Sequence, residues 1–389
     1  MNIERDIASS IRAVLDSPEA IVVTGLRRTG KTTLLRMLMN EVSTENKLFI
    51  DMENPANRKL FDEPNYDRIA DNLRFLGLDM KSKAYLFLDE VQFLRSVPSV
   101  VKYLMDHYSL KCILTGSAVF YLKNQFSESL AGRKYSFDLH PLSFREFLRF
   151  KGSPVKLDAL PETVTEAMHE SISRWYDEYM LYGGFPGVVL KESIREKEMM
   201  LDDIFTSYYQ MEVMQLGDFR RTNVIRDLIL LLLERSGSRL DVQKLAKELG
   251  AVRETVNNYL SFLEGTYFIS LIRPFSTNRD TEIRSQQKVY VCDTGLMNRF
   301  ARVASGSLFE NAAFLALRQR GAVSYYMKKS GVEIDFILNG STAFEIKQKA
   351  ETKDLSRLKK RATDINITES CIVSRRFCGV DGVIYGYQL

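Results

Sequence analysis

The stretch from Gly25 to Thr32 (GLRRTGKT) constrains the fold more than any other part of the sequence. It follows the apolar run 21–23 and precedes a segment rich in leucine and methionine, so it lies between a predicted strand and a predicted helix. Every fixed position of the pattern G-x-x-x-x-G-K-[ST] is filled. Glycine permits the turn in which successive backbone N–H groups surround an anion, and the following helix points its positive end there. The stretch therefore predicts a phosphate-binding loop on an α/β sheet.

This loop assigns the nucleotide contacts to a short run of residues. Lys31 is expected to reach the β- and γ-phosphates of ATP, and the Thr32 hydroxyl is expected to ligate Mg²⁺. The other residues expected to line the nucleotide are Gly25, Arg27, Arg28, Thr29, Gly30 and Thr33. ATP and Mg²⁺ are thus the predicted cofactors.

Length and composition limit the other possibilities. The chain has 389 residues, which is too long for one ordinary core, and we expect roughly two to four domains. No apolar run approaches the ~20 residues of a membrane span, the N-terminus lacks the apolar core of a signal peptide, and the cysteines lack metal-ligand spacing. These features predict a cytoplasmic protein without a membrane partner. The net charge of +4 permits contact with nucleic acid but does not require it.

A second apolar run, 84–88, ends in the carboxylates Asp89 and Glu90. Such a run is typical of a strand buried on both faces of a parallel sheet. In nucleotide hydrolases with a phosphate loop, the first acid holds Mg²⁺ and the second activates the attacking water. We therefore assign Asp89 to the metal and Glu90 to water activation.

Two later segments offer further groups for the same site. The predicted strand 112–114 is followed by Thr115 and Ser117, either of which could sense the γ-phosphate, because ligands bind outside the carboxyl ends of such strands. Arg133 could neutralise charge in the transition state. The alternatives are a polar turn and a surface arginine.

Together, these motifs resemble an AAA+ ATPase. The likeness rests on the phosphate loop with its paired arginines, the strand ending in Asp89-Glu90, the segment 114–117 (LTGS) and the segment 130–133 (LAGR). Segments 140–148 and 182–186 add a resemblance to a large prokaryotic family that joins an AAA ATPase domain to a C-terminal region of unknown function. The resemblance implies ATP hydrolysis coupled to a conformational change. It also implies a sensor role for Thr115 and an arginine-finger role for Arg133, within its own subunit or across a homo-oligomer.

The middle of the chain is predicted to be helical. Residues 141–215 are expected to form a lid over the nucleotide, with an aromatic face at 175–180 that packs internally. Segments 241–250 and 253–263 have helix-turn-helix spacing, and two predicted strands, 267–272 and 288–291, complete a winged helix. If its second helix enters a major groove, the reading face carries Arg253, Thr255, Asn257 and Asn258. The alternative is a protein-packing role, because Glu254 lies beside Arg253.

The C-terminal segment has the predicted element order helix, three strands, helix, strand. This order, together with Glu310, Asp335, Glu345 and Lys347, resembles the PD-(D/E)xK nuclease superfamily. Asp335 and Glu345 can converge on Mg²⁺ or Mn²⁺, and Lys347 lies two residues from Glu345 and therefore on the same strand face. In the alternative, these are strand-end charges of a domain that cuts nothing.

The sequence therefore predicts an α/β protein in four parts. These are a P-loop AAA+ core with a parallel sheet (1–140), a helical lid (141–215), a winged helix (216–300) and a restriction-endonuclease-like α/β domain (301–389). The expected function is ATP-driven conformational change on a partner, with DNA as the expected partner. The alternative is a signalling switch whose C-terminal domain binds a protein and is not a nuclease. A weaker third possibility is a chaperone-like remodeller.

Overall fold

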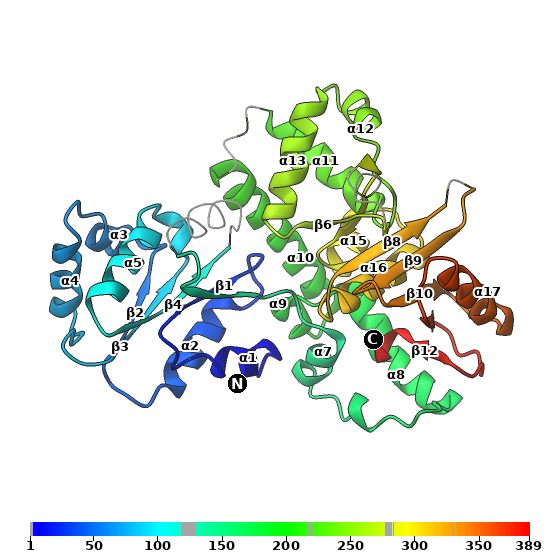
Figure 1. The fold of residues 1–389 in the computed structure, drawn as a ribbon, viewed down its shortest axis with the longest axis horizontal. Coiled ribbons are helices and arrows are strands. Elements are labelled where there is room, and N and C mark those ends of the chain that lie inside the picture. Colours follow the sequence, from blue (N-terminus) through cyan, green and yellow to red (C-terminus); the bar gives the residue numbers. More distant parts are fainter. Residues whose placement is uncertain are drawn as a thin grey trace. The chain divides into compact units, whose positions relative to one another are not determined.

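The computed structural model describes residues 3–117, 130–216, 219, 221–276, 282, 284–328 and 330–389 (Figure 1). It divides into two compact units. Unit 1 comprises residues 1–140 with 265–267, and unit 2 comprises residues 141–264 with 268–389. Within the described ranges, every helix is too short or too polar to span a bilayer.

Unit 1 alternates strands and helices around a parallel sheet, as expected for an α/β nucleotide-binding core. The strand order is β2-β3-β4-β1-β5, and every neighbouring pair is parallel. The elements are α1 (Ile7–Arg12), β1 (Ala20–Thr24), α2 (Lys31–Glu41), β2 (Lys47–Asp51), α3 (Pro55–Phe61), α4 (Tyr66–Phe75), β3 (Ala84–Asp89), a 3₁₀ turn (Val91–Phe93), α5 (Val97–His107), β4 (Leu110–Gly116) and β5 (Lys134–Asp138).

Helices cover both faces of this sheet (Figure 1). Successive side chains of each strand point to opposite faces, so each strand packs against helices on both sides. On β1, Val22 packs with the α3, α4 and α5 side, whereas Val23 packs with α1 and α2. Strands β1, β3 and β4 are fully buried along their length. Because the strands are parallel, Thr24, Asp89 and Gly116 end at the same edge of the sheet. The polar residues that follow them are therefore brought together.

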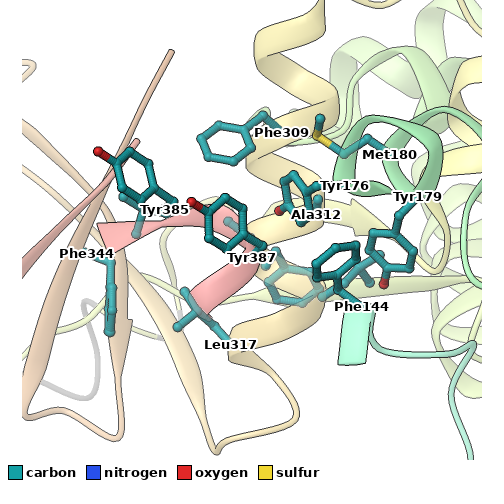
Figure 2. Close-up of a cluster of buried hydrophobic side chains, with 14 of the residues drawn as sticks. Phe144, Tyr176, Tyr179, Met180, Phe309, Ala312, Leu317, Phe344, Tyr385 and Tyr387 are labelled. Carbon is teal, nitrogen blue, oxygen red and sulfur yellow. The ribbon is translucent and has the colours of Figure 1, made fainter. Parts of the chain in front are cut away.

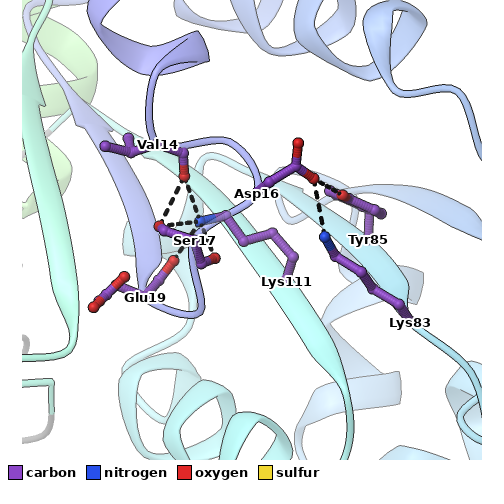
Figure 3. Close-up of polar contacts among 7 residues, drawn as sticks. All are labelled: Val14, Asp16, Ser17, Glu19, Lys83, Tyr85 and Lys111. Atoms are coloured by element: carbon purple, nitrogen blue, oxygen red, sulfur yellow. Dashed lines mark hydrogen bonds and ion pairs between the residues drawn. The ribbon is translucent and has the colours of Figure 1, made fainter.

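A buried lysine on β4 fixes the turn that leads into β1 (Figure 3). The Lys111 Nζ atom donates to the carbonyl oxygens of Val14 (2.9 Å), Ser17 (2.8 Å) and Glu19 (2.6 Å), and it lies 3.1 Å from the Ser17 hydroxyl. Burial lowers the pKa of Lys111 to about 8, and the nearby charge of Glu19 opposes this decrease. This ammonium anchors the segment that precedes the phosphate loop.

We expect Lys111→Met to destabilise unit 1 by about 2 to 4 kcal/mol, because it removes the side-chain donor that the buried carbonyl groups of Ser17 and Glu19 share. Urea denaturation followed by far-UV circular dichroism measures the change. Lys83→Met is the matched control, because the Lys83 amine makes an exposed ion pair with Asp16 at 2.9 Å. That pair should contribute less than about 1 kcal/mol. Equal effects of the two substitutions would contradict the anchoring role.

Unit 2 contains the remaining helices, a two-stranded ribbon and a mixed sheet. Its elements are α7 (Phe144–Phe150), α8 (Glu166–Tyr182), α9 (Pro186–Val189), α10 (Ile194–Tyr208) with a π-helical continuation (Tyr209–Leu216), α11 (Thr222–Glu234), α12 (Val242–Glu248), α13 (Arg253–Gly265), β6 (Ile269–Ile272), β7 (Lys288–Val291), α15 (Thr294–Phe300), α16 (Ser305–Leu317), β8 (Val323–Met327), β9 (Glu333–Leu338), β10 (Thr342–Lys347), α17 (Thr352–Thr363), β11 (Glu369–Ser374), β12 (Val383–Tyr385) and 3₁₀ turns at Leu157–Ala159 and Gly386–Gln388.

One hydrophobic core joins distant parts of unit 2 (Figure 2). The aromatic face of α8 is buried, as predicted: Tyr176 meets Phe144 of α7 edge to face at 5.0 Å and approaches Phe309 of α16 at 6.3 Å, measured between ring centroids. Tyr387, near the C-terminus, belongs to the same cluster. The segments predicted as lid, winged helix and nuclease-like domain therefore share a core, and their division into separate domains stays a prediction.

The C-terminal elements lie in the predicted order, α16-β8-β9-β10-α17-β11. The sheet order is β12-β11-β10-β9-β8, with β8, β9 and β10 antiparallel and β10, β11 and β12 parallel. One face of the sheet contributes Phe344 to the core shared with α16, and the other contributes Ile372 to a cluster with α17. The two segments predicted to form a helix-turn-helix are the helices α12 and α13, and the antiparallel pair β6 and β7 follows them. Their assembly into a winged helix stays a prediction.

Candidate active site

The phosphate loop of unit 1 requires glycine at both ends. A Cβ atom on Gly25 would lie 2.2 Å from the backbone oxygen of Leu139, so no larger residue fits there. Gly30 caps α2 with a left-handed φ of 97°, which favours glycine. Arg28 also has a positive φ, of 67°. The backbone between β1 and α2 is therefore folded into a tight loop ahead of the helix N-terminus.

Lys31 is buried and points back into this loop. Its Nζ atom donates to the carbonyl oxygens of Gly25 (3.0 Å) and Leu26 (3.1 Å). The Thr29 hydroxyl donates to the same Leu26 oxygen at 2.8 Å. Of the other predicted contact residues, Arg27 lies 4.0 Å from Glu53, and Thr33 is exposed on α2. The structure thus gathers the predicted loop residues around one backbone turn.

Arg5 supports the loop from the N-terminal segment, a contact that our sequence reasoning missed. This buried guanidinium donates to the carbonyl oxygens of Thr29 and His140, both at 2.7 Å. Arg5 lies 24 residues from Thr29 and 135 from His140, so no local pattern indicates the pairing. Arg5 therefore ties the phosphate loop at Thr29 to the segment that follows β5.

Asp89 lies where the metal-binding carboxylate was predicted, at the end of β3. It is buried, and it accepts hydrogen bonds from the hydroxyl groups of Thr115 and Thr32. Burial raises the pKa of Asp89, while these two hydrogen bonds oppose the rise. The structure therefore unites three predicted residues: the acid of β3, the sensor candidate of β4 and the first-turn threonine of α2.

Glu90 follows directly and adopts a left-handed conformation, with φ 53° and ψ 47°. Its backbone N–H lies 3.1 Å from the Thr115 hydroxyl oxygen, and its carboxylate accepts a hydrogen bond from the Gln92 amide. Gln92 also binds Ser117, because its Nε2 donates to the Ser117 hydroxyl at 2.8 Å and its Oε1 accepts from the Ser117 N–H at 3.2 Å. Gln92 was not identified from the sequence, although it lies two residues after the acid that it orients.

Arg133 is not brought to this site within unit 1. It immediately precedes β5, and its carbonyl oxygen accepts from Ala20 at the start of β1, whereas the phosphate loop follows the other end of β1. The intervening strand spans roughly 15 Å at 3.3 Å per residue. The exposed Arg133 guanidinium pairs with Asp106. The prediction that it acts within its own subunit is therefore not supported by its position, and a role toward a neighbouring subunit stays a prediction.

The C-terminal acids lie together in unit 2, but each has an internal partner. Glu310 of α16 accepts from the Tyr290 hydroxyl at 2.8 Å and lies 3.6 Å from the Lys288 Nζ atom. Asp335 of β9 accepts from the Ile346 N–H at 2.7 Å. Burial and the nearby charge of Glu310 raise the pKa of Asp335 to about 7.

Glu345 and Lys347 contact each other, as expected for one strand face. The Lys347 Nζ atom lies 2.7 Å from Glu345, and Arg361 of α17 contacts the other carboxylate oxygen at 3.0 Å. Glu345 is buried. In the part of the chain that the structure describes, no group of three or more Asp, Glu, His or Cys side chains is arranged to hold a metal ion. The arrangement therefore does not fit the metal role predicted for Asp335 and Glu345.

Comparisons with known proteins agree with the N-terminal assignment. Residues 17–148 match a family model described as an AAA domain, and residues 173–307 match a domain of unknown function, DUF8612. Relatives include the uncharacterized protein MJ1544 of Methanocaldococcus jannaschii, which is 27% identical over 89% of this chain and 79% of its own length. An uncharacterized protein of Haemophilus influenzae is 26% identical over 94% of this chain and 92% of its own length.

Solved structures align with much of this chain at low TM-scores. The Walker-type ATPase PABY2304 of Pyrococcus abyssi aligns over 77% of this chain and 95% of its own, with a TM-score of 0.47 and 17% identity. The Aeropyrum pernix ORC1 protein in complex with DNA aligns over 82% of this chain and 95% of its own, with a TM-score of 0.35 and 12% identity. The family match and the loop geometry lead to one assignment. Residues 17–148 of this chain are similar to AAA domains, and they contain the phosphate loop between β1 and α2.

Proposed function

We propose that the protein hydrolyses ATP at the edge of the unit 1 sheet where β1, β3 and β4 end. The observation that carries this proposal is the convergence of Lys31, Asp89 and Thr115 at that edge. Lys31 would exchange its two carbonyl acceptors for phosphate oxygens, which are stronger acceptors for an ammonium group. The backbone N–H groups of the loop and the N-terminus of α2 would hold the rest of the phosphate charge.

The side chains at this edge fit a magnesium ion, because the Thr32 hydroxyl and the buried Asp89 carboxylate are already in contact. Thr32 and Asp89 would hold the ion, which supplies positive charge against the phosphates when bound. The Glu90 carboxylate, oriented by Gln92, would accept the proton of the attacking water. Thr115 links the metal-side acid to the backbone of Glu90, and this link would relay the presence of the γ-phosphate.

We further propose that ATP hydrolysis is coupled to DNA bound by unit 2. The support is the exposed surface at the beginning of α13, where Arg253, Asn257 and Asn258 are all exposed. A helix that follows a helix-turn-helix corner and displays such side chains can enter a major groove. Arginine and asparagine can each form paired hydrogen bonds with base edges.

Phosphate release in the presence of Mg²⁺, measured with and without mixed-sequence duplex DNA over a salt series, tests this function. We expect duplex DNA to raise the hydrolysis rate, and the increase to fall steeply with salt. Arg253→Ala should weaken duplex binding by a factor of about 5 to 150, equivalent to 1 to 3 kcal/mol, in a fluorescence anisotropy titration. Arg195→Ala, which removes an exposed arginine of α10, is the matched control.

A second candidate function is a switch whose C-terminal region binds a protein partner and does not cut nucleic acid. It is favoured by one observation: Lys347 and Arg361 already neutralise Glu345. ATP hydrolysis that is insensitive to DNA, with equal duplex binding by the Arg253 and Arg195 variants, would favour this candidate over DNA coupling. The proposal that the protein hydrolyses ATP would be unaffected by that result.

A further inference from the structure

Lys288 of β7 is buried among the C-terminal acids. Only 5% of the residue is exposed, and its Nζ atom forms an ion pair with Glu333 and lies 3.6 Å from Glu310. The same atom lies 5.4 Å from the centre of the Tyr325 ring. Lys288 is not part of the nuclease-like pattern, which contains only the later residues. A lysine from the two-stranded ribbon thus reaches the acids of α16 and β9.

The surroundings of Lys288 keep its side chain charged. Burial alone would lower the pKa of Lys288, but the charge of Glu310 and the hydrogen bond with Glu333 raise it above its ordinary value. Asp335 adds a further attraction. An ammonium group among three carboxyl groups neutralises part of their mutual repulsion, as a bound cation would.

A divalent cation has little to bind while this ammonium is in place. Mg²⁺ and Mn²⁺ require several oxygen ligands, usually ionised carboxylates, and a fixed positive charge within a few ångströms repels them. Glu345 has its own cations, the side chains of Lys347 and Arg361. Asp335 is engaged by the N–H of Ile346. Each carboxylate that the nuclease-like pattern would offer to a metal therefore already contacts a donor group of this chain.

We propose that Lys288 is the internal counter-cation of Glu310 and Glu333, and that it keeps the C-terminal acidic cluster closed to divalent metal ions. This role is independent of the ATPase function proposed for unit 1. On this proposal, the chain has the residues of the nuclease-like pattern, but their carboxylates are paired with its own cationic side chains and not with a metal ion. Removal of the ammonium, with the carboxylates left in place, should convert the cluster into a metal site.

The test is an Mn²⁺ titration of the full-length protein without nucleotide, followed by isothermal calorimetry and by the electron paramagnetic resonance signal of free Mn²⁺. We expect Lys288→Met to gain a site that binds Mn²⁺ at least tenfold more tightly than the unaltered protein does. Adding Asp335→Asn should abolish that site, which separates it from any weak binding in unit 1. Lys288→Arg keeps the charge and should behave as the unaltered protein. Lys328→Met, which breaks an exposed pair with Asp364, controls for the loss of any lysine.

Two results would overturn the proposal. One is Mn²⁺ binding by the unaltered protein that is lost in Asp335→Asn, because the cluster would then accept a metal beside Lys288. The other is a folded Lys288→Met protein with no gain in Mn²⁺ affinity. If circular dichroism shows that Lys288→Met does not fold, the double variant Lys288→Met/Glu333→Gln removes the cation together with its ion-pair partner. The same gain is expected there through Glu310 and Asp335, and its absence would equally refute the proposal.

Discussion

Glu90→Gln is expected to lower the turnover number for ATP hydrolysis by a factor of about 10² to 10⁴ and to leave nucleotide binding nearly unchanged. Glutamine has nearly the shape of glutamate but cannot take the proton of the attacking water. The left-handed backbone of Glu90 and its contact with Thr115 do not depend on the carboxylate, so the phosphate loop should keep its structure. Phosphate release measures turnover, and a fluorescent ATP analogue measures binding.

The control for Glu90→Gln is Glu45→Gln, which makes the same chemical change at an exposed position of unit 1. It should alter neither turnover nor binding. If Glu90→Gln hydrolyses ATP within about twofold of the unaltered rate, another group activates the water and the assignment is wrong. If Glu90→Gln instead loses nucleotide binding, Glu90 contributes to binding ATP and not only to the hydrolysis step. The proposal that the loop binds ATP while Glu90 activates water would then be wrong.

Lys31→Ala is expected to weaken ATP binding by a factor of about 30 to several thousand, because removing one partner of a buried, hydrogen-bonded charge pair costs about 2 to 5 kcal/mol. Hydrolysis should fall with occupancy. The structure adds a reason for a large effect, because the Lys31 amine also binds two carbonyl groups of the loop. Loss of the Lys31 amine would therefore loosen the phosphate loop as well as remove a positive charge. Equilibrium binding of a fluorescent nucleotide gives the dissociation constant.

Lys47→Ala is the matched control for Lys31→Ala. The Lys47 amine also donates to a backbone carbonyl, that of Val42 at 2.8 Å, but it lies at the start of β2, away from the loop. Thermal unfolding of both variants separates loss of binding from loss of fold. ATP affinity in Lys31→Ala equal to that of the Lys47 variant would show that this lysine does not contact the nucleotide.

Much of the geometry of the candidate nucleotide site could be predicted, because its residues follow the ends of strands. The pattern around Gly25, the acids after residue 88 and the hydroxyl of Thr115 each follow an apolar run, and parallel pairing brings those ends together. Arg133 was harder to place for the same reason. It precedes a strand, and a residue before a strand in a parallel sheet lies at the opposite edge from the residues that follow one.

Two of the missed residues, Arg5 and Lys288, have partners far away in the sequence. Arg5 binds His140, and Lys288 pairs with Glu310 and Glu333 across separate elements. No spacing in the sequence predicts which acceptor a lysine or an arginine contacts, because these long, flexible side chains can reach many different acceptors in the fold. The order of the C-terminal elements could be predicted from hydrophobic patterns. The pairing of Glu310 and Glu333 with Lys288 could not be predicted, because Lys288 lies outside the segment predicted as the C-terminal domain.

The position of Arg5 changes where the functional ATPase begins. The matched AAA region starts at residue 17, but the guanidinium that holds the carbonyl of Thr29 belongs to Arg5, twelve positions earlier. A domain cut at the family boundary would keep every residue of the nucleotide motif and lose the support behind it. Extensions fused ahead of Arg5 would likewise be placed next to the phosphate loop. The residues that the site needs are thus determined by contacts in the fold and extend beyond the sequence motif.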